Sequence, residues 1–337
     1  IMKLFGKDLD KDVPIIAEIG VNHEGSIEDA LNLITLAYKS GADAVKFQSY
    51  TPERYISNND KDRYSRVKKF HINQEDHIRL INHAKRIGIN FFSTPVTEDW
   101  LPFLSKNTSA IKIASGDITF EPIIKEAAKT NLPVILSTGA SNINEINKAI
   151  AWFKESSEDK EISNRLILMH CVSLYPTPLE KANLNSIKFL KDHTGLKVGY
   201  SNHVEGIIAP SLAIGLGADL IEVHFTDSRE NKVFHDHFLS LNPKELSELT
   251  KTAPLIKKSM GKYDKFCNEK EKDNLSAIRK GIIAANNIKA GQIIESRNIM
   301  YARPSKFIPA SDFKKLLGQK AIKNIKKGTS IKLDMLE

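Results

Sequence analysis

Eight short apolar runs alternate with longer segments of helical period through the first 260 residues of the chain. This alternation is typical of repeated β-α units around a parallel sheet. Eight such units in about 250 residues predict a closed (β/α)8 TIM barrel rather than an open sheet. The runs expected to form strands lie near residues 15–17, 44–47, 90–92, 110–113, 133–136, 166–169, 197–200 and 220–223.

The segments between these runs carry helix signals. Residues 26–39 begin with a Ser cap and end before Gly41, and residues 73–86 end before Gly88. We therefore expect helices there, and we place the barrel domain at residues 1–261.

Polar side chains follow the expected strands, where each run ends. Active sites of TIM barrels form at the carboxyl ends of the strands, so these side chains are expected to share one mouth. In chain order they are Glu18, Lys46, Gln48, Thr94, Lys112, Ser115, Ser137, His170, Ser173, Tyr175, Ser201, His203 and His224.

Two histidines end successive runs, His203 and His224. Neutral imidazoles that converge on one rim suit a borderline divalent cation such as manganese, cobalt or zinc, with open positions for substrate. A lone histidine at a strand end is more often a hydrogen-bonded core residue, which is what we expect of His170. The pair is therefore the candidate metal site.

Two lysines, Lys46 and Lys112, lie inside apolar strands, where an unpaired ammonium group is costly. Each needs an anionic partner. A phosphate or carboxylate ligand would serve, and so would a structural ion pair, for which Glu18 is the candidate.

The net charge of +8 is concentrated in the tail, because residues 275–337 hold 13 Lys/Arg and 4 Asp/Glu while the rest of the chain holds 36 and 37. No aromatic stacking surface or nucleic-acid motif accompanies the surplus, so we expect no nucleic-acid partner. Cys171 and Cys267 support neither a disulfide framework nor a Cys-type zinc site. No apolar stretch approaches bilayer length, and we expect a cytoplasmic protein without a membrane partner.

A charged stretch at residues 262–274 is interpreted as a linker to a second domain at residues 275–337. Within that domain, residues 287–294 are echoed by residues 324–331. The echo predicts a β-turn unit used twice, in which glycine supplies the turn and the flanking isoleucines supply a small core.

Seven motifs, in order, resemble those of the sialic acid synthase family, which includes legionaminic and pseudaminic acid synthases. They are the segments at 17–25, 46–48, 93–95, 112–117, 136–139, 175–178 and 224–226. The resemblance implies that phosphoenolpyruvate condenses with an open-chain N-acetylmannosamine-type sugar, giving a nine-carbon 2-keto-3-deoxy acid and phosphate. It also implies a divalent metal, Mn2+ first, with Co2+ or Mg2+ as alternatives.

The same resemblance assigns roles to residues of this chain. His203 and His224 would hold the metal, and Glu18 would position or deprotonate the attacking water. Phosphoenolpyruvate would be bound by Lys46, Thr94, Lys112, Ser115, Ser137 and Ser201. The sugar side or the water would be bound by Gln48, Asp117, Ser173, Tyr175 and Asp236.

The tail resembles the antifreeze-like (SAF) domain of this family, a small β-rich fold. An Arg-Pro motif, here Arg303-Pro304, implies that Arg303 contacts the sugar across a domain-swapped homodimer; the alternative is a surface arginine before a turn proline. The chain departs from the family pattern at Asn202, around Asp236 and at Ser305, mostly on the sugar side.

The sequence does not identify the acceptor sugar. N-acetylmannosamine and a 2,4-diacetamido-trideoxyhexose are both compatible with the motifs. A 6-phosphorylated acceptor is also possible, but the sequence shows no surplus of arginine near the expected sugar residues that would indicate one. Two other classes remain: a metal-dependent aldolase or isomerase on the same barrel, which would not release phosphate, and a noncatalytic polysaccharide-binding protein.

Overall fold

The computed structural model describes residues 2–57 and 59–337, in two compact units, Ile1–Gly261 and Lys262–Glu337. Eight parallel strands of the first unit close into a barrel, as predicted, in the order β10-β3-β4-β5-β6-β7-β8-β9. The strands are β3 (Ile15–Gly20), β4 (Ala44–Ser49), β5 (Asn90–Pro95), β6 (Ile111–Ile113), β7 (Val134–Ser137), β8 (Leu166–His170), β9 (Lys197–Asn202) and β10 (Ile221–His224).

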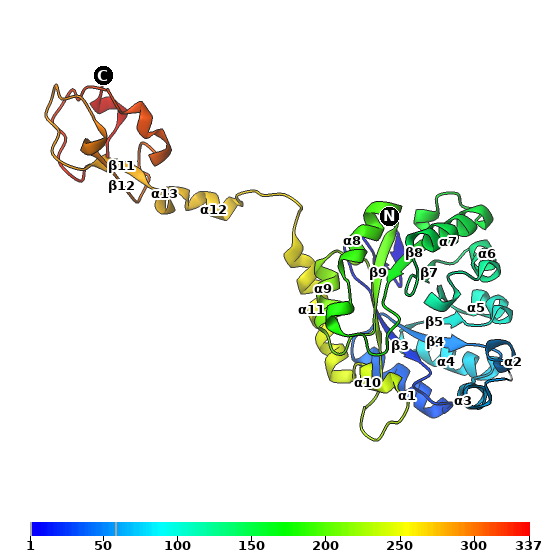
Figure 1. Cartoon of the computed structure of the whole chain (residues 1–337). Helices are drawn as coiled ribbons and strands as arrows, with labels where there is room; N and C mark the ends of the chain where they lie inside the picture. Colours follow the sequence, from blue (N-terminus) through cyan, green and yellow to red (C-terminus); the bar gives the residue numbers. More distant parts are fainter. Residues whose placement is uncertain (1, 58) are drawn as a thin grey trace. The chain divides into compact units, whose positions relative to one another are not determined.

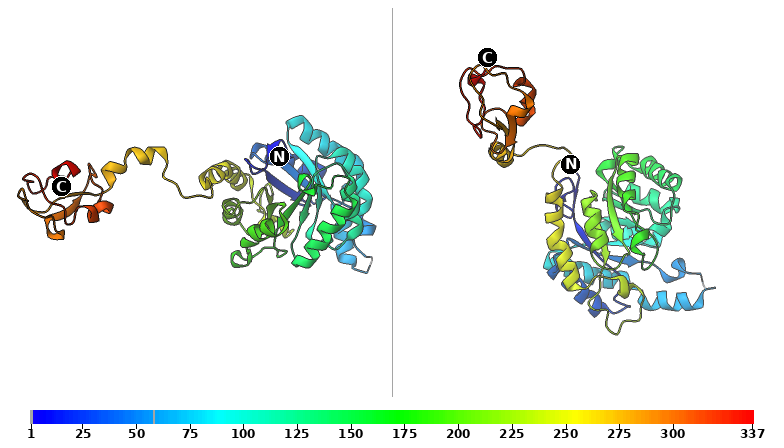
Figure 2. Two further views of the ribbon diagram at one scale, coloured as in Figure 1. Left: turned by 90° about the horizontal axis from the view of Figure 1, so that it is seen from above. Right: turned by 60° about the vertical axis from the view of Figure 1, so that its left-hand side comes forward.

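Helices surround the strands on the outside of the barrel (Figures 1 and 2). They are α1 (Ile27–Lys39), α4 (Gln74–Ile87), α5 (Leu101–Asn107), α6 (Glu121–Lys129), α7 (Ile143–Ser156), α8 (Asn185–Thr194), α9 (Ile208–Gly215) and α11 (Pro243–Met260). The two helices expected from their caps are present: the Ser26 side chain accepts from the Asp29 amide, and Gly88 ends α4 with φ +88. None of the described helices combines the length and apolar character needed to cross a bilayer.

The inside of the barrel is layered. At the amino ends of the strands an apolar layer fills the interior, capped by the short hairpin of β1 (Lys3–Leu4) and β2 (Lys7–Asp8). The layer includes Ile16, Ala44, Phe92, Ala110, Ile135 and Leu220. Because side chains of a strand alternate with period two, the residue two positions after each of these also points inward, one layer nearer the carboxyl ends. Those next residues are Glu18, Lys46, Thr94, Lys112, Ser137 and Glu222.

Two segments outside the regular β-α repeat lie at the carboxyl ends. The first is an insertion after β4 that holds α2 (Pro52–Tyr55) and α3 (Lys61–Phe70). The second is the loop after β10, which ends in α10 (Asp236–Leu239). Phe70 and Phe234 join them in an edge-to-face contact with ring centroids 5.3 Å apart.

The second unit is organised by the repeated turn. Ile288 and Ile325, from the two echoed segments, exchange backbone hydrogen bonds of 2.8 Å in both directions. Its regular strands are β11 (Gly281–Ala284) and β12 (Ile299–Ala302), with single bridges elsewhere. The stretch expected as a linker contains α12 (Glu269–Asp273), and α13 (Leu275–Ile278) follows it.

Candidate active site

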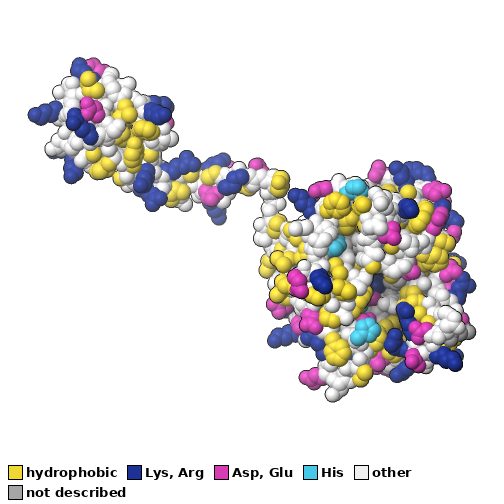
Figure 3. Space-filling view, in the orientation of Figure 1, with side chains coloured by type: hydrophobic (Ala, Val, Ile, Leu, Met, Phe, Trp, Pro, Cys, Tyr) yellow, Lys and Arg dark blue, Asp and Glu magenta, His cyan; other side chains and the backbone are white. Residues whose placement is uncertain are grey.

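A cavity of about 570 Å³ opens at the carboxyl ends of the barrel strands. The space-filling view shows the barrel unit hollowed on this face, with Lys and Arg side chains in and beside the hollow (Figure 3). Of the side chains expected at this mouth, all but His170, which was expected to be a hydrogen-bonded core residue, line the cavity: Glu18, Lys46, Gln48, Thr94, Lys112, Ser115, Asp117, Ser137, Ser173, Tyr175, Ser201, His203, His224 and Asp236. Arg303 belongs to the second unit, where its Nε donates to the Ile278 carbonyl.

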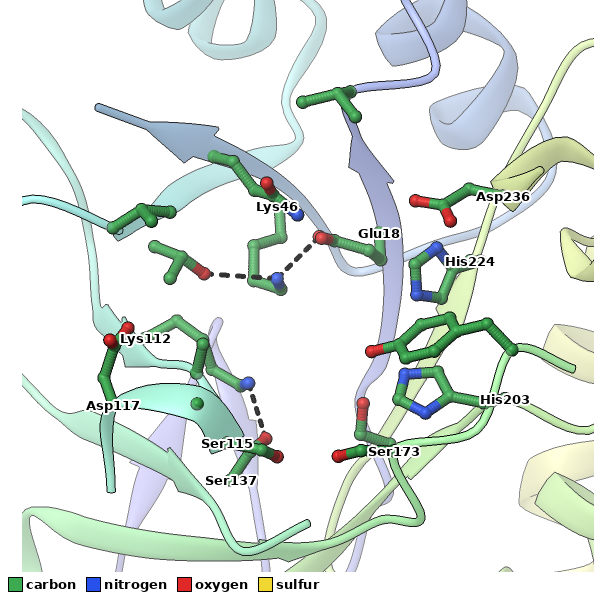
Figure 4. A pocket seen from close by; sticks show the side chains of 18 of the residues that line it. Glu18, Lys46, Lys112, Ser115, Asp117, Ser137, Ser173, His203, His224 and Asp236 are labelled. Carbon is green, nitrogen blue, oxygen red and sulfur yellow. Dashed lines mark hydrogen bonds and ion pairs between the residues drawn. The ribbon is translucent and has the colours of Figure 1, made fainter. Parts of the chain in front are cut away.

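The lysines and the histidines occupy opposite sides of this cavity (Figure 4). Lys46 Nζ lies 2.7 Å from Glu18 Oε2 and 3.3 Å from Thr94 Oγ1. Lys112 Nζ donates to Ser137 Oγ at 2.6 Å. The register explains the Lys46 contact, since Glu18 of β3 and Lys46 of β4 are direct neighbours across parallel strands. The structural ion pair considered from the sequence is therefore present.

A second buried carboxylate, Glu222, stands between the two lysines. Its Oε1 accepts from Ser201 Oγ at 3.0 Å and lies 3.8 Å from Lys46 Nζ and 3.9 Å from Lys112 Nζ. Its Oε2 has no hydrogen-bond partner among the described residues. Although burial opposes ionisation, Lys112 and Lys46 hold the pKa of Glu222 below its usual range. Glu222 thus stays a carboxylate.

The pKa values of the other three buried charged groups shift in directions set by the balance between burial and neighbouring charges. Burial raises the pKa of Glu18, with Lys46 acting against it. Burial lowers the pKa of Lys112, which Glu222 offsets only in part. Lys46 is also buried, but Glu18 and Glu222 raise its pKa above the usual value. Lys46 therefore remains an ammonium group facing the cavity.

His203 and His224 lie side by side, with ring centroids 5.3 Å apart. The Val172 carbonyl is 2.6 Å from His203 Nδ1, and because a carbonyl only accepts, Nδ1 carries the proton and Nε2 keeps its lone pair. Burial, helped by His224, lowers the pKa of His203 to about 3. The Tyr175 ring packs on His203, with centroids 4.1 Å apart. The His203 ring is thus held in place, and it is neutral near pH 7.

These two imidazoles fit a divalent cation. A neutral ring with a fixed tautomer is the form that binds metal, and the buried Nδ1 of His224 has no hydrogen-bond partner in the described chain. Within residues 2–57 and 59–337, no group of three or more His, Cys, Asp and Glu side chains has metal-binding geometry. The protein ligands would accordingly be two, which leaves several positions for substrate and water.

A close approach of three loops builds the hydroxyl wall beside Lys112. The Gly139 amide donates to Ser115 Oγ at 3.0 Å, and Ser115 Oγ lies 3.0 Å from Cys171 Sγ. A Cβ atom at Gly139 would come within 2.5 Å of Ser173 Oγ and 2.8 Å of Ser115 Oγ. Glycine is required here because any side chain would push these hydroxyls apart.

The sugar-side residues lie around the cavity mouth. Asp117 follows β6, and burial raises its pKa to about 6 despite the opposing charge of Lys112. Asp236 begins α10, and its Oδ1 is 3.0 Å from His235 Nε2. Asn202, where the family pattern has aspartate, instead bonds locally: its Oδ1 accepts from the Val204 amide and its Nδ2 donates to the Val204 carbonyl. It is not among the residues that line the cavity.

The sequence interpretation missed three charged residues that line this cavity, Glu222, Arg63 and Arg66. Glu222 carries the same signal as Lys46 and Lys112, a charged side chain inside an apolar strand, two residues before His224 on the same face. The arginines lie on α3, outside the β-α repeat, so strand ends gave no reason to place them here. Two arginines therefore line the same cavity as the expected sugar residues, where the sequence interpretation had found no surplus of arginine.

Comparison with known proteins agrees with this arrangement. Residues 33–265 match the NeuB family and residues 279–337 match the SAF domain. The chain is 42% identical to an uncharacterised protein of Methanocaldococcus jannaschii, over 94% of this chain and 92% of that protein. It is 37% identical to the N,N'-diacetyllegionaminic acid synthase of Campylobacter jejuni, over 96% of this chain and 99% of that protein.

A solved structure resembles it closely as well. The N-acetylneuraminic acid synthetase of Leptospira borgpetersenii, crystallised with citrate, superposes with a TM-score of 0.73 at 34% identity, covering 78% of this chain and 90% of that one. These matches exclude the noncatalytic polysaccharide-binding alternative. The chain belongs to the NeuB family, and it is a synthase-type enzyme with a C-terminal SAF domain.

Proposed function

We propose that the enzyme condenses phosphoenolpyruvate with the aldehyde of an open-chain N-acetylmannosamine-type sugar, giving a nine-carbon 2-keto-3-deoxy acid and inorganic phosphate. The observation that carries this proposal is the arrangement of the cavity. One wall presents two lysines and several hydroxyl groups, which suit an anionic enol ester, and the opposite wall presents the imidazoles of His203 and His224.

The donor would lie along the lysine wall. Lys46 and Lys112 would bind its phosphate and carboxylate, and Thr94, Ser115 and Ser137 would donate hydrogen bonds to the same oxygens. The Ser201 hydroxyl, which lies beside Glu222, would be a further contact for the donor. Binding the donor here would hold its C3 toward the imidazole side, where the aldehyde has to be.

His203 and His224 would hold a divalent metal, with Mn2+ as the first candidate. Such an ion supplies Lewis-acid polarisation of the aldehyde oxygen when it is bound. The chain's own contribution is orientation: the Val172 carbonyl and the Tyr175 ring fix His203 before any ligand arrives.

The reaction ends with water at C2. Attack of C3 on the aldehyde leaves a cationic C2, water adds there, and the C–O bond to phosphate breaks to give the ketone. Glu18 would position this water or take its proton. Burial raises the pKa of Glu18, which makes its carboxylate a stronger base for accepting a proton from this water.

The test is product analysis. Wild-type enzyme with Mn2+ is given phosphoenolpyruvate and a panel of free and phosphorylated amino-sugars, and mass spectrometry follows the products. We expect the nine-carbon acid and phosphate, with oxygen-18 from the bridging position of the donor recovered in phosphate. Condensation of pyruvate without phosphate release would indicate the aldolase alternative and reject the proposal.

A second acceptor class, the 2,4-diacetamido-trideoxyhexoses, is favoured by two observations. The relative named for legionaminic acid synthesis is similar over nearly its full length. In addition, Tyr55, Val67, Phe70 and Phe234 give one side of the cavity mouth an apolar surface. Such a surface suits the methyl groups of a second acetamido substituent and of a 6-deoxy carbon. The panel above separates the two classes.

The pH profile for the acceptor should report Asp117. Its pKa is raised to about 6 by burial, so it becomes protonated as the pH falls through that value and then loses an acceptor site for sugar hydroxyls. We expect kcat/KM for the acceptor, at saturating donor, to fall on the acid side with an inflection near that pH. Asp117→Asn should remove this inflection; an unchanged profile in the variant would assign it to another group.

We also propose a domain-swapped homodimer, in which Arg303 of one chain reaches the sugar in the other. Arg303→Ala should lower kcat/KM for the acceptor by about tenfold, through loss of a charge-assisted hydrogen bond, and should affect the donor less. Mixed with an inactive His224→Ala chain, the Arg303→Ala chain should regain activity. Absence of rescue in a verified heterodimer would argue against shared sites.

A further inference from the structure

Two arginines of α3 face the cavity mouth without a carboxylate partner. Arg63 and Arg66 are three residues apart, so they lie on one face of the helix together with the buried Val67 and Phe70. The Arg63 guanidinium is held over the Tyr55 ring, 5.9 Å from its centroid. In the described part of the chain no ion pair involves either arginine, whereas nearby Arg54 pairs with Glu98 and Asp99.

The rest of α3 strengthens this positive charge. The helix carries five basic residues and one acidic residue, Asp62. Like charges at this spacing on one helix face disfavour each other, and neither arginine has an ion-pair partner among the described residues that would offset this repulsion. An anion bound between the two guanidinium groups would relieve this repulsion.

The floor of the cavity, in contrast, is close to neutral before substrate binds. Glu18 lies 2.7 Å from Lys46, and Glu222 lies within 4 Å of both Lys46 and Lys112. Two carboxylates therefore already face two ammonium groups. The mouth also carries the acidic Asp117 and Asp236. The floor lysines alone thus provide little net attraction for a multiply charged donor approaching from solvent.

We propose that Arg63 and Arg66 form an anion-capture site at the cavity mouth, which draws the phosphate group of phosphoenolpyruvate from solvent and passes the donor inward to Lys46 and Lys112. This role rests on the proposed donor. Charges at the rim of a cleft with low-dielectric walls raise the local concentration and the association rate of an oppositely charged ligand. Arg63 and Arg66 lie at the cavity mouth, so an entering ligand meets their charges before it reaches the lysines.

The test compares two double variants with the same loss of charge. Arg63→Gln/Arg66→Gln removes the proposed site, and Lys61→Gln/Lys68→Gln removes two exposed charges of the same helix that do not line the cavity. kcat/KM for phosphoenolpyruvate is measured at saturating neutral acceptor, at ionic strengths of about 0.01 M and about 1 M, where the screening length falls from about 30 Å to about 3 Å.

We expect the arginine variant to lose about tenfold in kcat/KM for the donor at low salt and less than about twofold at high salt. The lysine variant should keep kcat/KM for the donor within about twofold of the wild type at both ionic strengths. An equal loss in both variants would mean a general field of the helix, and a loss that falls on the acceptor, including a phosphorylated acceptor, would assign the arginines to the sugar. Either outcome, or no effect, overturns the capture site.

Failure of this inference is separable from failure of the proposed function. Product formation by the wild type at high salt tests the reaction and does not depend on capture at the rim. Melting temperatures of both variants show whether the fold is kept, which is expected because all four side chains are exposed.

Discussion

His203→Ala and His224→Ala are each expected to lower metal-dependent turnover by about a thousandfold, equivalent to about 4 kcal/mol of lost transition-state stabilisation. Each change removes one imidazole of the proposed metal-binding pair, whose ring centroids lie 5.3 Å apart in the cavity. The fold should be kept, because both side chains lie at strand ends on the cavity wall and outside the apolar layers. Steady-state rates at a fixed, ordinary Mn2+ concentration provide the measurement.

His170→Gln is the matched control. His170 ends β8 and is buried like the other two, but its Nε2 bonds to the Ala182 carbonyl and it does not line the cavity. Its variant should keep turnover within about threefold of the wild type, since only a structural hydrogen bond changes. A His224→Ala enzyme that turns over at the wild-type rate would reject the metal assignment.

Lys46→Met is expected to have a comparably large effect, on both donor binding and stability. The change removes the ammonium group proposed to bind phosphate, which should weaken phosphoenolpyruvate binding by about a hundredfold. It also leaves Glu18 buried without its partner at 2.7 Å, and breaking a buried ion pair costs about 3–5 kcal/mol of unfolding free energy. Calorimetric titration with the donor and chemical denaturation measure the two effects.

The double variant Lys46→Met/Glu18→Leu separates the two roles of Lys46. Replacement of both partners by apolar side chains is often close to neutral for stability, so the free energy of unfolding should largely recover. Donor binding should not recover, because no ammonium group is restored. If the double variant bound the donor as tightly as the wild type, Lys46 would serve only to neutralise Glu18.

Much of the barrel and its site could be predicted from the hydrophobic periodicity of the sequence and from the positions of polar residues after each apolar run. All eight predicted strands are present, because each apolar run is short and lies between helical segments with clear ends. The candidate residues then converge because parallel strands of a closed barrel end at one mouth. Lys46 and Lys112 were identifiable for the same reason that makes them costly: charged side chains in buried strands need partners. Glu222 follows the same rule, so the sequence also marks it as a charged side chain in a buried strand.

Other features were decided only by the tertiary structure. The sequence left open whether a ligand or Glu18 neutralises Lys46, and the register of β3 against β4 brings Glu18 to 2.7 Å. Arg63 and Arg66 reach the cavity because α3 packs through Val67 and Phe70 at the mouth, in an insertion that the β-α repeat does not predict. Local pattern fixes which residues belong to a strand or helix and which face they share. Contacts between segments distant in the chain depend on packing, which no local pattern encodes.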